Sequence, residues 1–141
     1  MIRKAIEQDI PELAALGMAF AKISEPYHHI VPNKGKVEAF ANDMVRNPDA
    51  IVMVLSIEGN IEGFICGLII EPYFSTDKVL QEMALYTTKG LGMVKLIDAL
   101  EEEAIARGVT RIVVGSKPDF CDLSNIYKRK GYKLFEEQYI K

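Results

Sequence analysis

The stretch that most constrains the fold is residues 79–107, because its hydrophobic period changes once, across a short turn. Residues 79–86 form a strand-like run, and residues 87–92 read T-T-K-G-L-G. Beyond the glycines, apolar side chains recur at steps of three and four residues, as in an amphipathic helix. These side chains are Leu91, Val94, Ile97, Leu100 and Ala104. The sequence therefore predicts a strand, a turn of small residues and a long helix.

A junction of this kind can bind an anion, because the first N–H groups of a helix have no internal partner and lie at the positive end of its dipole. Gly90 and Gly92 would let a phosphate approach the main chain. A plain tight turn would also select glycine, so both interpretations stay open here. The chain contains no G-x-x-x-x-G-K-[ST], and no G-x-G-x-x-G with an acidic residue about 20 positions later. A P-loop or a Rossmann site is thereby excluded.

The bulk properties exclude several classes of protein. The length of 141 residues suits one domain with a substantial core, so we expect a single domain over residues 1–141. A net charge of −3 gives no basic face for nucleic acid. No apolar run reaches the ~18 residues of a membrane span, and no signal-type segment opens the chain, so we expect a cytoplasmic protein. Cys66 and Cys121 lie far apart and suggest neither a disulfide nor a metal site.

The first half of the chain predicts a strand, two helices and a hairpin. Residues 1–6 form the strand, and Asp9 would cap the first helix with Glu12 three positions on, as in a capping box. Residues 23–34 contain two prolines and no clean period, so we expect a loop. The second helix would bury one apolar side, formed by Val37, Phe40, Met44 and Val45.

Two β-rich runs, residues 51–57 and 61–70, flank the turn E-G-N and predict a hairpin. Their continuous apolar character is typical of central strands that are covered on both faces. After the long helix, residues 110–115 predict a buried strand parallel to residues 79–86. A short helix at residues 122–130 and a final strand at residues 132–140 complete the expected elements.

The predicted order of elements is β-α-α-β-β-β-α-β-α-β. Together with the K-G-L-G turn, the R-I-V-V strand and the segment I-Y-K-R-K-G-Y-K-L, this order resembles the GNAT superfamily of acyl-CoA-dependent N-acyltransferases over nearly the whole chain. The resemblance implies an α/β (α+β) fold with a mixed, mostly antiparallel sheet and helices on both faces. It also implies an N-acetyltransferase that uses acetyl-CoA and no metal, and whose acceptor is a small-molecule or peptide amine.

The same resemblance assigns a site for acetyl-CoA. Its pyrophosphate loop would consist of Thr87, Thr88, Lys89, Gly90, Leu91 and Gly92, and the main chain of Met83, Ala84 and Leu85 would bind the pantetheine arm. The family's loop usually begins with Arg or Gln, where this chain has Thr87. Lys89 would then supply the positive charge.

Two residues are candidates for catalysis. Tyr127 lies where the family often places a tyrosine that donates to the departing thiolate, and Glu82 is the candidate base. Each also has a structural interpretation, Tyr127 as a core residue and Glu82 as an exposed strand position. Tyr27, His28 and Tyr73 are candidates for contact with the acceptor, although adjacent histidines such as His28 and His29 are more often simply solvated.

Two other functions remain open at this level. A non-catalytic relative would bind CoA or a protein partner in a regulatory role, and the Thr87 departure favours it. An unrelated α/β domain would use G-L-G only as a turn, and in that case the strands at residues 79–86 and 110–115 should pair along their lengths. The apolar strands also make a homodimer an expectation.

Overall fold

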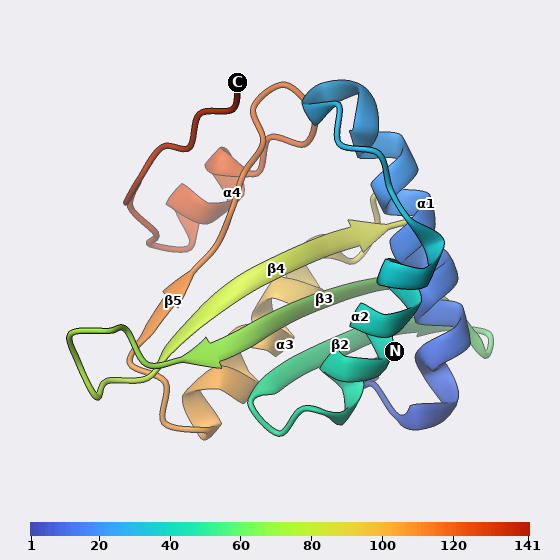
Figure 1. The fold of residues 1–141 in the computed structure, drawn as a ribbon. Helices are drawn as coiled ribbons and strands as arrows, with labels where there is room; N and C mark the ends of the chain where they lie inside the picture. Colours follow the sequence, from blue (N-terminus) through green and yellow to red (C-terminus); the bar gives the residue numbers. More distant parts are fainter.

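The structure, a computed structural model, describes residues 1–141 as an open five-stranded sheet with helices on both faces (Figure 1). The strands lie in sequence order, and they are β1 (Ile2–Lys4), β2 (Ala50–Ile57), β3 (Asn60–Ile70), β4 (Val79–Thr87) and β5 (Arg111–Val113). Neighbouring strands are antiparallel except β4 and β5, which are parallel. The predicted mixed, mostly antiparallel sheet is confirmed.

The helices divide between the two faces of the sheet. The helices α1 (Ile10–His28) and α2 (Lys34–Arg46) cover one face, and α3 (Met93–Ala106) covers the other (Figure 1). The short α4 (Ser124–Arg129) packs on the α3 side, where Tyr127 joins the buried cluster. Successive side chains of β2 point to opposite faces of the sheet and so contribute to two separate cores. Ile51 and Met53 face α3, whereas Val54 faces α1 and α2.

The predicted hairpin is confirmed as β2 and β3. Glu58 and Gly59 connect the two strands, and both have positive φ, at 52° and 83°. Two-residue turns of this type match the twist of the strands they join, and glycine is favoured in them for that reason. Buried side chains occupy both faces of β2 and β3, as expected for central strands.

The loop predicted at residues 23–34 is wrong over its first part, because α1 continues to His28 with Pro26 inside its last turn. Tertiary contacts hold this extra turn. The Tyr27 ring packs on Phe120 at a centroid distance of 4.8 Å, and the hydroxyl of buried Ser24 donates to Ala21 O. A proline near the end of a helix removes little helical hydrogen bonding, and packing outweighs its low propensity.

Asp9 is the N-cap residue of α1, as predicted, but its side chain makes no cap hydrogen bond there, so the predicted capping box is wrong. A 3₁₀ turn (Glu7–Asp9) precedes α1, and the Asp9 carboxylate accepts from the N–H of Ile6 at 2.8 Å and from Arg3 at 2.7 and 2.9 Å. Glu12 accepts from the N–H of Ile61 at 2.9 Å instead of completing a capping box. Both carboxylates therefore tie the start of α1 to the sheet.

Three further expectations are wrong in whole or in part in the second half of the chain. Helix α3 begins at Met93, so Leu91 lies outside it and is 62% exposed, and Val94 in its first turn is 46% exposed. Ile97, Leu100 and Ala104 are buried as predicted, and Leu96 completes the buried stripe. The strand predicted at residues 132–140 is absent. Most of its apolar side chains are exposed, namely Leu134, Phe135, Tyr139 and Ile140, and β5, at the edge of the sheet, has only three residues with which a further strand could pair. β5 itself is shorter and less buried than predicted.

Candidate active site

The central feature of the site is an opening between β4 and β5. The two strands pair from Val79 with Arg111 to Gln81 with Val113, and β4 then continues to Thr87 without a partner on that side. A parallel neighbour that stops pairing leaves main-chain groups of β4 unbonded. If G-L-G were only a turn in an unrelated α/β domain, the two strands should pair along their lengths. The early end of pairing between β4 and β5 differs from that expectation.

A bulge in β4 lies beside the opening. Cys66 of β3 pairs with Ala84 and Gly67 pairs with Glu82, so Met83 has no partner opposite it. β-bulges redirect side chains and often lie next to functional sites.

The main-chain groups of β4 that face the opening follow from the ladder with β3. Thr88 donates its N–H to Glu62 O, which makes these two residues a hydrogen-bonded pair. Because the pattern alternates, the N–H and C=O groups of Leu85 and Thr87 point away from β3, and those of Ala84 point toward it. Of the predicted pantetheine contacts, Leu85 therefore presents its main chain to the opening, Ala84 faces β3 and Met83 lies in the bulge.

The turn after β4 leads directly to the start of α3. Gly90 and Gly92 have φ of 65° and 79°, and Gly92 is the N-cap, without a side-chain cap. The first helical bond runs from Leu96 N–H to Gly92 O, so the N–H groups of residues 93–95 have no helical acceptor. Thr88, Lys89 and Leu91 are exposed along the same turn.

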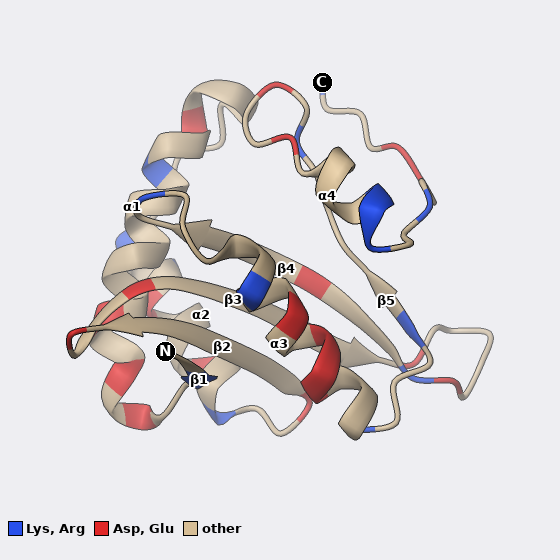
Figure 2. Cartoon of the chain, turned by 180° about the vertical axis from the view of Figure 1, so that it is seen from behind, with Lys and Arg blue, Asp and Glu red and all other residues tan.

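Lys95 adds a positive charge that the sequence argument missed. It lies in the first turn of α3, where Figure 2 shows a basic segment, with acidic segments following further along the helix. A lysine three positions after Gly92 was the available signal.

Thr87 does not belong to the exposed turn. It is the last residue of β4, it is 5% exposed, and its methyl group packs on Gly63, where a Cβ would lie 2.8 Å from Thr87 Cγ2. Its hydroxyl is buried without a hydrogen-bond partner. Thr88 donates its hydroxyl to Glu62 Oε2 at 2.6 Å. Neither threonine hydroxyl thus replaces the Arg or Gln of the family's loop.

Glu82 is the only acidic residue of β4, visible as the single red segment of that strand in Figure 2. Burial raises the pKa of its carboxyl from 4.5 to about 7, and the nearby charge of Lys117 offsets part of this effect. A carboxyl group with a pKa near neutrality can accept a proton and release it again at physiological pH.

Tyr127, from α4, faces the same region. It is 5% exposed, and its hydroxyl is buried without a hydrogen-bond partner. Burial raises the pKa of this phenol above its ordinary value, and the charge of Glu82 adds to that effect. The two predicted catalytic residues therefore lie near enough to interact electrostatically, and the phenol stays protonated.

Of the predicted acceptor contacts, only Tyr27 joins a group beside the opening. Phe20 packs against Tyr86 and Phe120, with ring centroids 5.5 and 6.1 Å apart, and the Lys117 Nζ lies 6.0 Å from the centre of the Phe20 ring. Tyr27 reaches this cluster through Phe120. Phe120 and Lys117 belong to the segment after β5, where no periodicity pointed to them.

His28 and Tyr73 lie elsewhere. His28 Nδ1 accepts from the Ile30 N–H at 2.9 Å, and its Nε2 lies 3.2 Å from Ser24 Oγ. Both ring nitrogens therefore make their contacts at the C-terminal end of α1. Tyr73 is fully exposed in the loop before β4, at the opposite end of that strand from the glycine turn, and packs only edge-on against Phe74.

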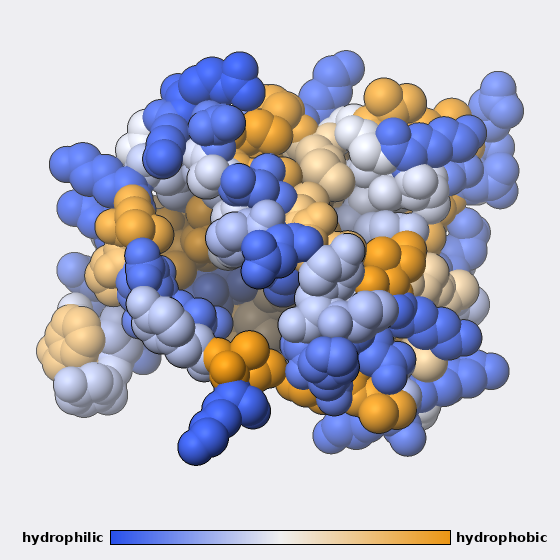
Figure 3. All heavy atoms as spheres, turned by 90° about the horizontal axis from the view of Figure 1, so that it is seen from above, coloured by the Kyte–Doolittle hydropathy of each residue, from blue (hydrophilic) through white to orange (hydrophobic).

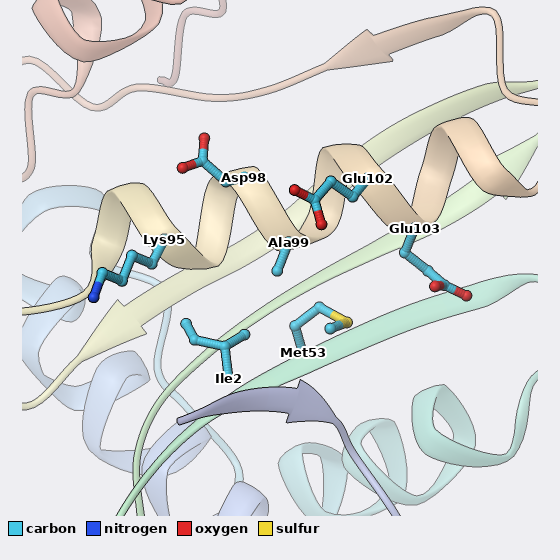
Figure 4. A pocket seen from close by; sticks show the side chains of 7 residues that line it. All are labelled: Ile2, Met53, Lys95, Asp98, Ala99, Glu102 and Glu103. Atoms are coloured by element: carbon cyan, nitrogen blue, oxygen red, sulfur yellow. The ribbon is translucent and has the colours of Figure 1, made fainter.

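A separate hollow of about 440 Å³ lies between α3 and the strands β1 and β2 (Figure 4). Its lining residues are Ile2, Met53, Lys95, Asp98, Ala99, Glu102 and Glu103. It shares only Lys95 with the first turn of α3 and no residue with the opening between β4 and β5. No group of three or more His, Cys, Asp or Glu side chains is arranged to hold a metal ion. None of the helices combines the length and the apolar character that crossing a bilayer requires.

No model of a known sequence family matches the chain, and no curated protein matches it in sequence. Solved structures do match over its whole length. A probable acetyltransferase is 17% identical with a TM-score of 0.78, over 100% of this chain and 96% of the other. A predicted acetyltransferase from Clostridium acetobutylicum, solved with acetyl-CoA, is 21% identical with a TM-score of 0.76, over 99% and 93%.

A third solved structure is an aminoglycoside acetyltransferase from an uncultured soil metagenomic sample, in complex with sisomicin. It is 20% identical with a TM-score of 0.70, over 100% of this chain and 92% of the other. These likenesses show that the chain has the GNAT fold.

Proposed function

We propose that the protein is an N-acetyltransferase that moves an acetyl group from acetyl-CoA to a primary amine by direct attack. The observation that carries this proposal is the parting of β4 from β5 after Gln81 and Val113. An extended ligand can bond to the main-chain groups that the missing strand leaves free. Solved acetyltransferases share this fold, and one of them contains acetyl-CoA.

The residues present fit acetyl-CoA in two respects. The buried Tyr127 hydroxyl lacks a partner, and a Cβ on Gly90 would meet nothing within 4 Å, so the turn is open to a bulky anion. In the proposed complex the main chain of Leu85 bonds the pantetheine arm. The N–H groups at the start of α3 hold the pyrophosphate, and Lys89 and Lys95 add attraction at longer range.

Bound acetyl-CoA supplies a thioester whose carbonyl carbon is open to attack by an amine. Glu82 takes a proton from the amine nitrogen as the new C–N bond forms and the C–S bond breaks. Tyr127 donates its phenol proton toward the departing sulfur, and the raised pKa keeps that proton in place beforehand. The products of this transfer are an N-acetylated amine and coenzyme A.

A non-catalytic CoA-binding or partner-binding role is the second candidate, and the burial of Thr87 favours it. The usual basic or amide side chain of the loop is absent, and Thr87 turns its side chain into the protein instead of replacing it. Such a loop would bind the pyrophosphate through main-chain groups and lysines alone.

Calorimetric titration with acetyl-CoA, coenzyme A and ATP tests the proposal. We expect saturable binding of both CoA species and little response to ATP, followed by acetylation of an amine in an assay for released thiol. Binding without acetylation of any amine would favour the non-catalytic role. No binding at millimolar concentration would overturn both CoA-based functions.

A further inference from the structure

An apolar hollow of about 370 Å³ lies on the α1–α2 face of the sheet. This volume falls within the ~300–1,000 Å³ typical of small-molecule sites. Its floor consists of Val52, Phe64, Cys66 and Ala84, which come from β2, β3 and β4, and its walls come from α1 and α2. Figure 3 shows apolar patches between hydrophilic side chains on the molecular face seen from above.

Small side chains create this hollow. The helices touch where a Cβ on Gly17 would lie 3.1 Å from Val37 Cγ1, which holds α1 and α2 at a fixed separation. Ala21 on α1 and Ala41 on α2 then leave the space between the helices and the sheet unfilled. Apolar surface of this kind gains free energy when an apolar group covers it.

The hollow shares walls with the proposed reaction site. Ala84 lines it and lies directly beside the bulge of β4, next to Leu85. Phe20 also lines it, and the same ring packs on Tyr86 and lies 6.0 Å from Lys117 Nζ. A molecule whose apolar part fills the hollow therefore has its other end near the opening.

The charges of the lining select among amines. The lining contains no Asp or Glu, and its polar side chains are Asn33 and Lys36. Lys36 takes part in none of the salt bridges of the molecule. An acceptor with several ammonium groups would meet one positive charge and no compensating carboxylate there. An acceptor with one amine and an apolar body would place no additional ammonium group near Lys36, and so would avoid this repulsion.

We propose that this hollow holds the apolar body of the acceptor, and that the acceptor is an alkyl or arylalkyl primary amine. The inference rests on the proposed acetyl transfer. It adds the class of acceptor and the surface that selects it.

The test compares phenethylamine and hexylamine with spermidine as acceptors at saturating acetyl-CoA. We expect kcat/KM to be about tenfold or more higher for the two apolar amines, as hydrophobic pockets commonly discriminate by that factor. Spermidine as the best acceptor would overturn the inference and leave acetyl transfer standing. Failure of the separate acetyl-CoA titration would remove the proposed function itself, and the acceptor assignment with it.

Two alanines of α2 provide a matched pair of variants. Ala41 lines the hollow, and Ala39, two positions away, is exposed. Ala41→Leu fills the hollow, so we expect its KM for phenethylamine to rise about tenfold, with the affinity for acetyl-CoA unchanged. Ala39→Leu should leave both quantities unchanged. Equal KM values in the two variants would overturn the inference.

A second variant, which enlarges the hollow, keeps the inference testable if Ala41→Leu does not fold. Val45 also lines the hollow, and Val45→Ala lengthens the available space. We expect this variant to shift its preference from hexylamine toward octylamine by several-fold in kcat/KM relative to the wild type. A preference that stays the same would count against the hollow as the acceptor site.

Discussion

A Cβ on Gly92 would lie 2.9 Å from Leu55 Cδ2, whereas a Cβ on Gly90 would meet nothing within 4 Å. Both glycines have positive φ, so both need glycine for their backbone conformation. Their surroundings separate two roles within one turn. Gly92 lets α3 sit directly on β2, and Gly90 leaves room for a ligand.

Substitution of the two glycines should therefore have different effects. Gly90→Ala places a methyl group where we propose that pyrophosphate binds, so its affinity for acetyl-CoA should fall, with a loss of stability of ~1–2 kcal/mol from the left-handed conformation. Gly92→Ala adds the contact with Leu55 and should lower the free energy of unfolding further, by another ~1–3 kcal/mol. Calorimetry and urea unfolding measure both effects. Unchanged affinity in Gly90→Ala would argue against the turn as the pyrophosphate site.

Replacement of Tyr127 by Phe should separate chemistry from packing. The hydroxyl has no partner in the folded protein, so its removal should leave the free energy of unfolding unchanged or slightly higher. If the phenol donates to the departing sulfur, kcat should fall by ~10²-fold. The affinity for acetyl-CoA should change less. A parallel loss of kcat, affinity and stability would show that Tyr127 serves packing instead.

The pKa of Glu82 predicts the pH dependence of the reaction. The base must be ionised, so kcat/KM should rise with pH and show an inflection near pH 7, the value to which burial raises the pKa. Glu82→Gln should remove this inflection and lower kcat/KM by ~10²-fold or more. Persistence of the same inflection in the variant would assign it to another group.

Glu82 should also affect stability as a function of pH. Its pKa is about 7 in the folded protein and 4.5 when unshifted, so between these values the folded state binds the extra proton. Stability from this group is therefore highest below pH 4.5 and falls as pH rises toward 7. Urea unfolding at several pH values should show that Glu82→Gln gains stability relative to the wild type over this interval. A constant difference between the two proteins would contradict this linkage.

The ion pair at the start of α1 should matter more than a similar pair at the surface. The Asp9 carboxylate is buried and accepts from Arg3 and from Ile6 N–H, which lower its pKa. Asp9→Asn should cost ~1–3 kcal/mol at neutral pH, and in the wild type this stability should disappear as pH falls below 3.8. The pair of Glu7 with Arg46 is exposed on both sides, so Glu7→Gln should cost under ~1 kcal/mol. Equal losses would contradict the role of burial.

Local patterns were sufficient for most of the fold. The E-G-N turn between two apolar runs predicted the central hairpin, because turn chemistry and strand periodicity agree at that point. The strand, glycine turn and helix at residues 79–107 were predicted for the same reason, although α3 starts after Leu91. The resemblance to GNAT proteins then supplied the residues of the candidate site.

Features that depend on distant contacts were not predictable from the sequence. The last turn of α1 exists because Tyr27 packs on Phe120, and no local pattern connects these residues. The bulge at Met83 follows from register with β3, which the β4 sequence alone does not reveal. The segment after Tyr132 was predicted as a strand from its local sequence, but it is exposed and forms none. Its residues have strand propensity, yet no neighbouring strand is long enough to pair with them.

The bulge at Met83 has a consequence for how β4 tolerates change in length. Leu80 and Leu85 both face α3 although they are an odd number of positions apart, and a regular strand would send them to opposite faces. The extra residue of the bulge shifts the alternation of side chains by one position, so both leucines point toward α3. Deletion of the bulged residue would leave the two leucines an even number of positions apart, so a regular strand would keep both on the α3 face and β4 should tolerate this loss. Deletion of two residues would restore an odd spacing, and Leu85 and every later side chain of β4 would then turn to the other face unless a bulge formed again.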